Sequence, residues 1–126
     1  MQNINKNLVS VIIPCYNAAL FINETIGSIL NQSHQSIELI VVDDGSTDES
    51  KSVINLISDN RIYYYYQKNN GVSSARNLGF QKSIGDFVVF FDADDIWHPE
   101  KLAIQLHAAE KNDLDLICSR MIDFTD

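Results

Sequence analysis

Cysteine and proline are both scarce in this 126-residue sequence, which contains two of each. The cysteines, Cys15 and Cys118, form neither a metal-ligand pattern nor a disulfide framework, so we expect buried, reduced thiols. A chain of this length can bury roughly two thirds of its unfolded surface, so it can form a hydrophobic core without cross-links. We therefore expect residues 1–126 to form a single domain, or part of a larger one.

Basic residues are also few. Nine lysines and arginines stand against 17 aspartates and glutamates, which gives a net charge of −8. No basic stripe is present, and this argues against a nucleic-acid backbone as the main partner. An anionic small substrate is compatible with this charge, provided that a metal ion first changes the sign of the local field.

Long apolar runs are absent. No run reaches membrane-spanning length, and residues 1–7 lack the apolar core of a signal peptide. We therefore expect no transmembrane segment and a cytoplasmic location. For a longer parent protein, that expectation includes peripheral association with the cytoplasmic face of the membrane.

Short apolar runs alternate along the chain with segments of helical period. Strands are predicted at 8–13, 37–42, 62–66, 87–91 and from 113 to 117. Helices are predicted over 19–31, from Ser46 or Thr47 to 60, from Ser73 or Ser74 to 83, and after Pro99. This alternation predicts an α/β fold, with a mostly parallel, Rossmann-like sheet flanked by helices on both faces.

The residue types place some of these elements further. Tyrosines on both faces of the strand at 62–66 indicate a position nearer the sheet edge, where their hydroxyls can reach water. Five apolar residues in a row at 87–91 predict a strand that is buried on both faces. Pro14 should end the first strand, because proline cannot donate to a strand ladder. The last helix is expected to carry these apolar residues: Leu102, Ile104, Leu106 and Ala109.

The strand at 87–91 runs directly into three carboxylates, Asp92, Asp94 and Asp95. Open α/β sheets place their ligand sites at the carboxyl ends of strands. Carboxylates alternating as in Asp92 and Asp94 are hard oxygen ligands that suit Mg²⁺ or Mn²⁺. The alternative is a solvated acidic turn that merely ends the strand.

Three strands end in polar loops that should converge on one rim of the sheet: 14–17, 43–46 and 92–95. Tyr16 there could stack on a nucleobase, or it could simply pack on the first helix. Asp44 could accept a hydrogen bond from an N–H group at a base edge, or it could cap a turn. Arg76 could meet a base, ribose or phosphate, or it could form a surface ion pair.

Four motifs in this order carry a resemblance to family 2 glycosyltransferases. They are residues 9–17 (VSVIIPCYN), 41–48 (VVDDGSTD), 70–79 (NGVSSARNLG) and 91–95 (FDADD). The chain is similar, over about residues 9–117, to the nucleotide-sugar-binding half of the GT-A fold. The resemblance implies an inverting, metal-dependent enzyme that transfers a sugar from a nucleoside diphosphate, by family habit UDP, to an acceptor hydroxyl.

The resemblance also implies roles for individual residues. Tyr16 matches the residue that lies against the base, Asp44 the acid that contacts it, and Arg76 the basic residue of the nucleotide pocket. Asp94 matches the metal ligand of the Asp-x-Asp motif, and Asp92 lies nearer the ribose and is a second metal candidate. The full implied set for the nucleotide is Pro14, Tyr16, Asn17, Asp44, Gly71, Arg76 and Asp92.

No position matches the family's general base, which is expected beyond Asp126 together with most acceptor contacts. The acceptor could be a glycan, a lipid-linked glycan or a protein, and the isolated chain should turn over poorly or not at all. Three alternatives remain at this point. They are a receiver-type phosphoacceptor domain, a phosphatase with Asp92 as nucleophile, and a non-catalytic module that binds nucleotide sugars.

Overall fold

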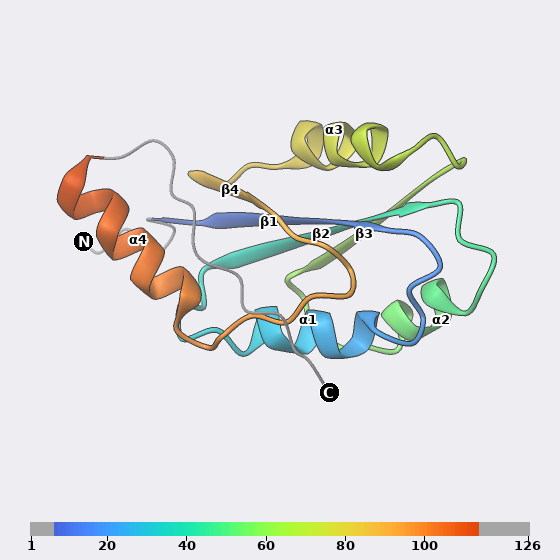
Figure 1. Ribbon diagram of the computed structural model, residues 1–126, viewed down its shortest axis with the longest axis horizontal. Helices are drawn as coiled ribbons and strands as arrows, with labels where there is room; N and C mark the ends of the chain where they lie inside the picture. Colours follow the sequence, from blue (N-terminus) through green and yellow to red (C-terminus); the bar gives the residue numbers. More distant parts are fainter. Residues whose placement is uncertain (1–6, 114–126) are drawn as a thin grey trace.

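The computed structural model describes residues 7–113, which form a four-stranded parallel sheet covered by helices on both faces (Figure 1). The strand order is β3-β2-β1-β4, and the expected α/β class is confirmed. No helix in this part of the chain is long and apolar enough to cross a membrane. The elements in order are β1 (Val9–Cys15), α1 (Ile22–Leu30), β2 (Ile37–Asp44), α2 (Ser50–Asn55), β3 (Ile62–Gln67), α3 (Val72–Lys82), β4 (Phe87–Phe90) and α4 (Lys101–Asn112).

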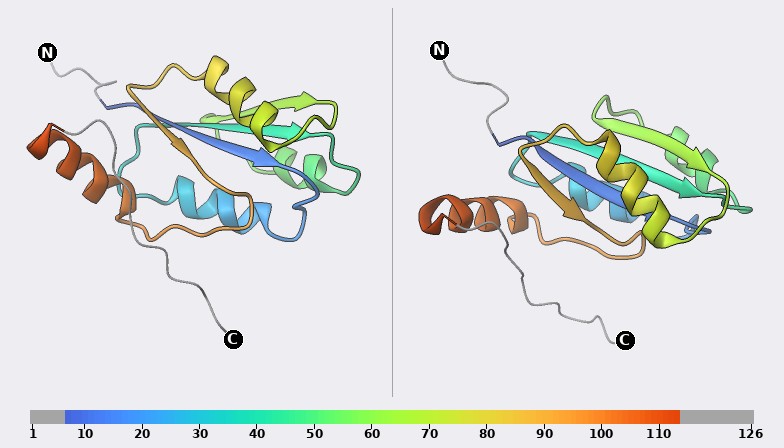
Figure 2. Two further views of the ribbon diagram at one scale, coloured as in Figure 1. Left: turned by 45° about the horizontal axis from the view of Figure 1, so that its top comes forward. Right: turned by 90° about the horizontal axis from the view of Figure 1, so that it is seen from above.

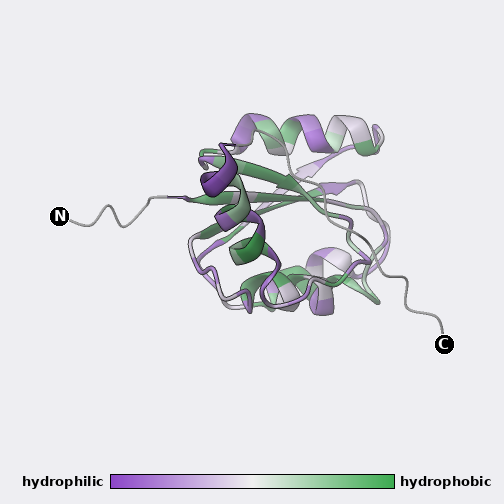
Figure 3. Ribbon diagram, turned by 60° about the vertical axis from the view of Figure 1, so that its left-hand side comes forward, coloured by the Kyte–Doolittle hydropathy of each residue, from purple (hydrophilic) through white to green (hydrophobic). Residues whose placement is uncertain are grey.

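Alternate residues of β1 serve the two faces of the sheet, as the period of a strand requires. Val11 and Ile13 point into a large core that includes Ile26 of α1 and extends to α2 and α4. Ile12 points the other way, into a smaller core that includes Ala75 of α3. Figure 2 shows α3 alone on its face of the sheet, and Figure 3 shows apolar strands between helices of mixed polarity.

Pro14 lies inside β1 and does not end it, so the prediction for this residue is wrong. Pairing between β1 and β4 stops at Ile12, whereas pairing with β2 continues to Cys15. Residues two apart in a strand point their backbone polar groups toward the same neighbouring strand. For Ile12 this neighbour is β4, because the Ile12 carbonyl oxygen accepts a hydrogen bond from the backbone N–H of Phe91, and the same therefore holds for Pro14. Because β4 no longer pairs with β1 at Pro14, the N–H group that proline lacks costs no hydrogen bond of the strand ladder.

Helix α2 begins at Ser50, later than the predicted start at Ser46 or Thr47. The Asn17 side chain accepts hydrogen bonds from the backbone N–H groups of Thr47 and Asp48. The Asp48 carboxylate in turn accepts from both the backbone N–H and the hydroxyl of Ser50. These side-chain contacts offer the backbone an alternative to the helix, which therefore starts only after them.

Strand β3 lies at one edge of the described sheet, as its tyrosines predicted, but β4 lies at the other. The prediction that β4 is buried on both faces is wrong, since Val88 and Val89 are only partly buried and Phe90 is 49% exposed. In α4, Leu102, Leu106 and Ala109 are buried, whereas Ile104 is 63% exposed. The strand predicted at 113–117 lies outside the described residues, apart from its first residue.

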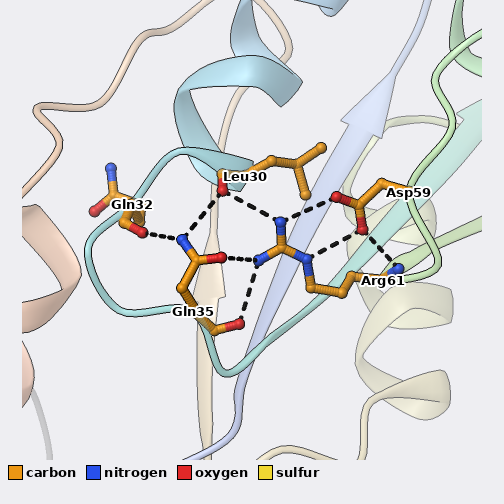
Figure 4. A network of polar contacts seen from close by, with 5 residues as sticks. All are labelled: Leu30, Gln32, Gln35, Asp59 and Arg61. Atoms are coloured by element: carbon orange, nitrogen blue, oxygen red, sulfur yellow. Dashed lines mark hydrogen bonds and ion pairs between the residues drawn. The ribbon is translucent and has the colours of Figure 1, made fainter.

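Arg61 directly precedes β3 and links three segments of the chain (Figure 4). Its guanidinium donates to the Asp59 carboxylate and to the backbone carbonyl oxygens of Leu30 and Gln35. Leu30 is the last residue of α1, where a cation is favourable because the helix dipole leaves its carbonyl end negative. The Arg61 hydrogen bonds, first of all, hold the pKa of Asp59 below its ordinary value of 3.8.

Replacing Arg61 by methionine should lower the free energy of unfolding by about 2 kcal/mol, because several hydrogen bonds to a charged, partly buried group are lost. The measurement is urea unfolding at pH 7. Lys51→Met is the matched control, because Lys51 is exposed on α2 and should leave stability within about 0.5 kcal/mol of the native value. Equal stability of the two variants would contradict the assigned role of Arg61.

Candidate functional site

The loops that follow β1, β2 and β3 meet at one end of the sheet, at the right of Figure 1. A cavity of about 310 Å³ lies there, at the carboxyl ends of the strands. It is lined by Pro14, Cys15 and Tyr16 from β1 and the loop after it, Asp44 from the end of β2, and Asn69, Gly71 and Val72 before and within α3. Four residues predicted from the sequence are thus brought together, namely Pro14, Tyr16, Asp44 and Gly71.

Tyr16 and Cys15 are neighbours in the sequence but differ in their surroundings. Tyr16 is 51% exposed where it lines the cavity, so its aromatic ring is available to a ligand. Cys15 is a free, fully buried thiol, as expected. Burial, together with the nearby Asp43 carboxylate, raises the pKa of Cys15 to about 11, so the thiol stays protonated and inert at neutral pH. Cys118 lies outside the described residues.

Asp44 is the polar centre of the cavity and is almost completely buried, at 5% exposure. Its Oδ1 accepts hydrogen bonds from Gln67 Nε2 at 2.7 Å and from the backbone N–H of Asn70, with an N–O distance of 2.8 Å. Its Oδ2 accepts from the backbone N–H of Gly71, with an N–O distance of 3.1 Å. The carboxylate therefore fixes the loop that leads from β3 to α3.

These hydrogen bonds also decide the charge of Asp44. Burial alone raises the pKa of this carboxyl group, but the bonds from Gln67, Asn70 and Gly71 outweigh burial and hold the pKa below 3.8. Asp44 is consequently an ionised acceptor at neutral pH. Gly71 can take part because its φ of +95° is one that other residues resist, as the turn pattern indicated.

Asn17 does not line the cavity. Besides its bonds to the loop before α2, its backbone N–H donates to the Ser46 hydroxyl with an N–O distance of 3.0 Å. Its φ of +49° is in the left-handed region, which asparagine tolerates better than most residues. Asn17 thus joins the loops after β1 and β2, and its predicted contact with nucleotide stays a prediction.

Arg76 and Asp92 meet at the neighbouring corner of the site. Arg76 Nη2 lies 3.2 Å from Asp92 Oδ1, and this ion pair links α3 to the loop that follows β4. The pair is substantially exposed, with 40% of the Arg76 side chain and 58% of the Asp92 side chain accessible, so it contributes little stability. Arg76 Nε is buried and has no hydrogen-bond partner among the described residues.

Asp92 and Asp94 are both exposed beyond the end of β4. Their oxygen donors are of the kind that Mg²⁺ and Mn²⁺ prefer, and exposed carboxylates can turn toward an incoming ion. Within residues 7–113, however, no three His, Cys, Asp or Glu side chains are grouped so that they could hold a metal ion. The residues present therefore fit a divalent ion only if a ligand such as a diphosphate supplies further oxygens.

Gln67, Asn69 and Val72 belong to the site, but the sequence patterns did not indicate them. Asn69 and Val72 line the cavity, and Gln67 holds Asp44. A signal for Gln67 does exist in the sequence, because parallel pairing of β2 with β3 sets it opposite Asp44. Finding it would have required the register of these two strands as well as their positions.

A comparison of the sequence with protein families matches residues 10–126 to the family described as glycosyl transferase family 2. The chain belongs to this family. An uncharacterized glycosyltransferase from Haemophilus influenzae is 45% identical to it over 113 residues, which are 87% of this chain and 45% of that relative. The resemblance seen in the four motifs is thereby confirmed.

Two solved structures share the fold, and the expected GT-A architecture is confirmed for the described part of the chain. TarS 1–349 from S. aureus, in complex with UDP-GlcNAc, superimposes with a TM-score of 0.77 at 29% identity, over 83% of this chain and 32% of that TarS chain. The mannosyltransferase PcManGT from Pyrobaculum calidifontis, in complex with GDP-Man and Mn²⁺, gives 0.75 at 29% identity, over 81% of this chain and 32% of PcManGT. The chain thus spans less than half the length of each of these three proteins.

Proposed function

We propose that this chain is the donor-binding portion of an inverting, divalent-metal-dependent glycosyltransferase that uses a nucleoside-diphosphate sugar, with a UDP-sugar as the expected donor. The observation that carries this proposal is the cavity in which Tyr16, Asp44 and Gly71 meet beside the Arg76–Asp92 pair. The nucleotide sugars bound by TarS and PcManGT support the same class of donor.

The base of the donor is assigned to the cavity itself. The exposed ring of Tyr16 offers a stacking surface, and stacking on an aromatic side chain is worth about 1–3 kcal/mol per base. The ionised Asp44 accepts a hydrogen bond from an N–H group at the base edge. Because this carboxylate is buried, a base that offers it no donor binds less well.

The diphosphate is assigned to the corner formed by Arg76, Asp92 and Asp94. Arg76 contributes a positive charge, and its unpartnered Nε can donate a hydrogen bond to a phosphate or ribose oxygen. Asp92 and Asp94 would hold the divalent ion, with Asp94 as the principal ligand. When bound, such an ion supplies Lewis-acid stabilisation of the negative charge that develops on the departing diphosphate.

The transfer step needs residues from outside this portion. In an inverting reaction an acceptor hydroxyl attacks the face of the sugar opposite the diphosphate, while a carboxylate removes its proton. We place that general base beyond Asp126 and assign no described residue to it. The acceptor is proposed to be a growing glycan, a lipid-linked glycan or a protein.

Family membership displaces two of the alternatives drawn from the sequence. For a receiver-type phosphoacceptor, the neighbouring Asp43 would be a natural target, but it is 2% exposed and accepts hydrogen bonds from Tyr64 and from the backbone N–H of Ser46. In the phosphatase alternative, the cavity at Tyr16 and Asp44 would have no role. A non-catalytic module that binds nucleotide sugars differs from our proposal only in the parent protein's ability to transfer sugar.

Titration of UDP into the native chain, with and without Mn²⁺, tests the proposal by calorimetry. We expect Mn²⁺ to strengthen UDP binding about tenfold in the native chain, because the ion removes the repulsion between the diphosphate and the carboxylates. In Asp94→Ala this metal-dependent gain should disappear, while the metal-independent part of the affinity should persist.

Asp86→Asn is the matched control for this experiment. Asp86 accepts a hydrogen bond from the backbone N–H of Leu8, beside the start of β1 and far from the cavity, so its variant should keep the full response to Mn²⁺. A metal response that survives in Asp94→Ala would refute the role of Asp94. Absence of UDP binding by the native chain under all conditions would refute the proposed function.

A further inference from the structure

Asp44 presents its two oxygens unequally, and Gln67 is the side chain responsible. Two donors, Gln67 Nε2 and the backbone N–H of Asn70, converge on Oδ1. A single donor, the backbone N–H of Gly71, reaches Oδ2. Each carboxylate oxygen can accept about two hydrogen bonds, so Oδ1 is saturated and Oδ2 keeps one acceptor position.

This single position is what the cavity has to offer a base at Asp44. The carboxylate is ionised and 5% exposed, so it acts only as an acceptor and has little access to solvent. The backbone donors of Asn70 and Gly71 are fixed by the loop before α3. Gln67 is the one side-chain donor to Asp44 in the part of the chain that the structure describes, so its identity decides how many acceptor positions stay open.

We propose that Gln67 is a specificity-determining residue that restricts the site to bases with one imide N–H group, and this proposal rests on the proposed function. Uracil and thymine present a single N–H donor between two carbonyl groups, which matches one acceptor position. Guanine presents two adjacent donors, its N1–H and its amino group, and one of them would lack a partner. Cytosine can donate an amino N–H to this position, but its adjacent ring nitrogen is an acceptor, and the carboxylate repels that lone pair.

Gln67 acts through Asp44 and is therefore a positioning residue. The pairing of β2 with β3 sets the two residues opposite each other at the last step of the ladder, and the Gln67 amide donates to Oδ1 at 2.7 Å. If the amide donor is removed, one position opens on Oδ1 beside the one on Oδ2. Two neighbouring acceptor positions are what the two donors of guanine require.

The test is a set of calorimetric titrations with UDP, dTDP, GDP and CDP, each with Mn²⁺, on the native chain and on Gln67→Met. In the native chain we expect UDP and dTDP to bind about tenfold more tightly than GDP and CDP. In Gln67→Met the ratio of UDP to GDP affinity should fall about tenfold, while CDP stays weak. Loss of folding alone would weaken all four nucleotides together.

Tyr66→Phe is the control, because Tyr66 neighbours Gln67 on β3, is 59% exposed and does not line the cavity. It should keep the native preference. Gln67→Ala, which also lacks the donor, serves as a second variant, and thermal unfolding shows whether each variant is folded. The titrations of the native chain give a result even if neither variant folds.

The outcomes separate this inference from the function on which it rests. If the native chain binds no nucleoside diphosphate, both fail. If it binds GDP as tightly as UDP, the restriction to one imide N–H is wrong, and the proposed function stands. If the native preference persists in a folded Gln67 variant, the assigned role of Gln67 is wrong.

Discussion

Replacing Gly79 by alanine is expected to lower the free energy of unfolding by about 3 kcal/mol. Gly79 lies on the face of α3 that packs against the sheet, and a Cβ atom at this position would lie 2.4 Å from Ile12 Cγ2. Ile12 is fully buried in the small core with Ile40 and Ala75, so its methyl group has nowhere to move. The substitution therefore has to lift α3 away from β1.

The same displacement should weaken nucleotide binding. Helix α3 carries Arg76, and Gly71 immediately before it supplies one of the donors to Asp44. A helix that no longer rests on β1 moves both groups relative to the cavity. Urea unfolding measures the first effect, and titration with UDP and Mn²⁺ measures the second.

Gly27→Ala is the matched control, since Gly27 is also a helical glycine and a Cβ atom there would have no neighbour within 4 Å. It should leave stability unchanged or raise it by about 0.5–1 kcal/mol, because alanine is the better helix former. A double-mutant cycle with Ile12→Ala gives the sharper test. Removing the obstructing methyl group should make the two losses less than additive, and strict additivity would contradict the proposed steric cause.

The order of the elements could be read from the sequence because each element carries its own period. The tyrosines of β3 even indicated its place at an edge of the sheet. What failed were properties that depend on a neighbour. Phe90 is exposed although it belongs to an apolar run, because β4 pairs only with β1 in the described sheet. Pro14 continues β1 because β4, the strand toward which its backbone nitrogen points, no longer pairs with β1 beyond Ile12.

From the pattern of strands in the sequence, only the residues at the ends of strands could be assigned to the site. Parallel strands bring their carboxyl ends to one edge, and this was enough to bring Tyr16 and Asp44 together. The hydrogen-bond partners of Asp44 depend on the register between β2 and β3 and on the path of the loop before Gly71, and neither has a local signal in the sequence. Asn17 shows the limit of such a prediction, because it lies at a strand end but hydrogen-bonds to the neighbouring loop and does not line the cavity.

Replacing Asp44 by alanine is expected to have the largest effect on the site, with UDP affinity falling about 100-fold. The substitution removes the acceptor for the base. It also leaves Gln67 Nε2 and the backbone N–H groups of Asn70 and Gly71 without the partner they have in the native chain. The loss of these hydrogen bonds to a charged, buried group should lower the free energy of unfolding by about 3 kcal/mol.

Two contributions to that loss of affinity have to be separated, namely direct contact with the base and support of the loop before α3. Asp44→Asn separates them. The asparagine amide keeps one oxygen that can accept a hydrogen bond from the loop, but its NH₂ group faces at least one of the N–H donors that the carboxylate accepts from in the native chain. If Asp44 only supports the loop, all nucleotides should weaken by the same factor in both variants. If it contacts the base, the preference for UDP over CDP should vanish as well.

Comparison with Gly79→Ala completes this separation, because the two substitutions are expected to cost similar stability by different routes. A loss of stability alone barely changes affinity while the folded state still predominates, so the affinity of each variant reports on its site. Gly79→Ala should weaken UDP and CDP alike, since it moves a helix and leaves the Asp44 carboxylate in place. A loss of base preference that occurs with Asp44→Ala but not with Gly79→Ala therefore identifies direct contact between Asp44 and the base. The same loss in both variants would assign the preference to the position of α3.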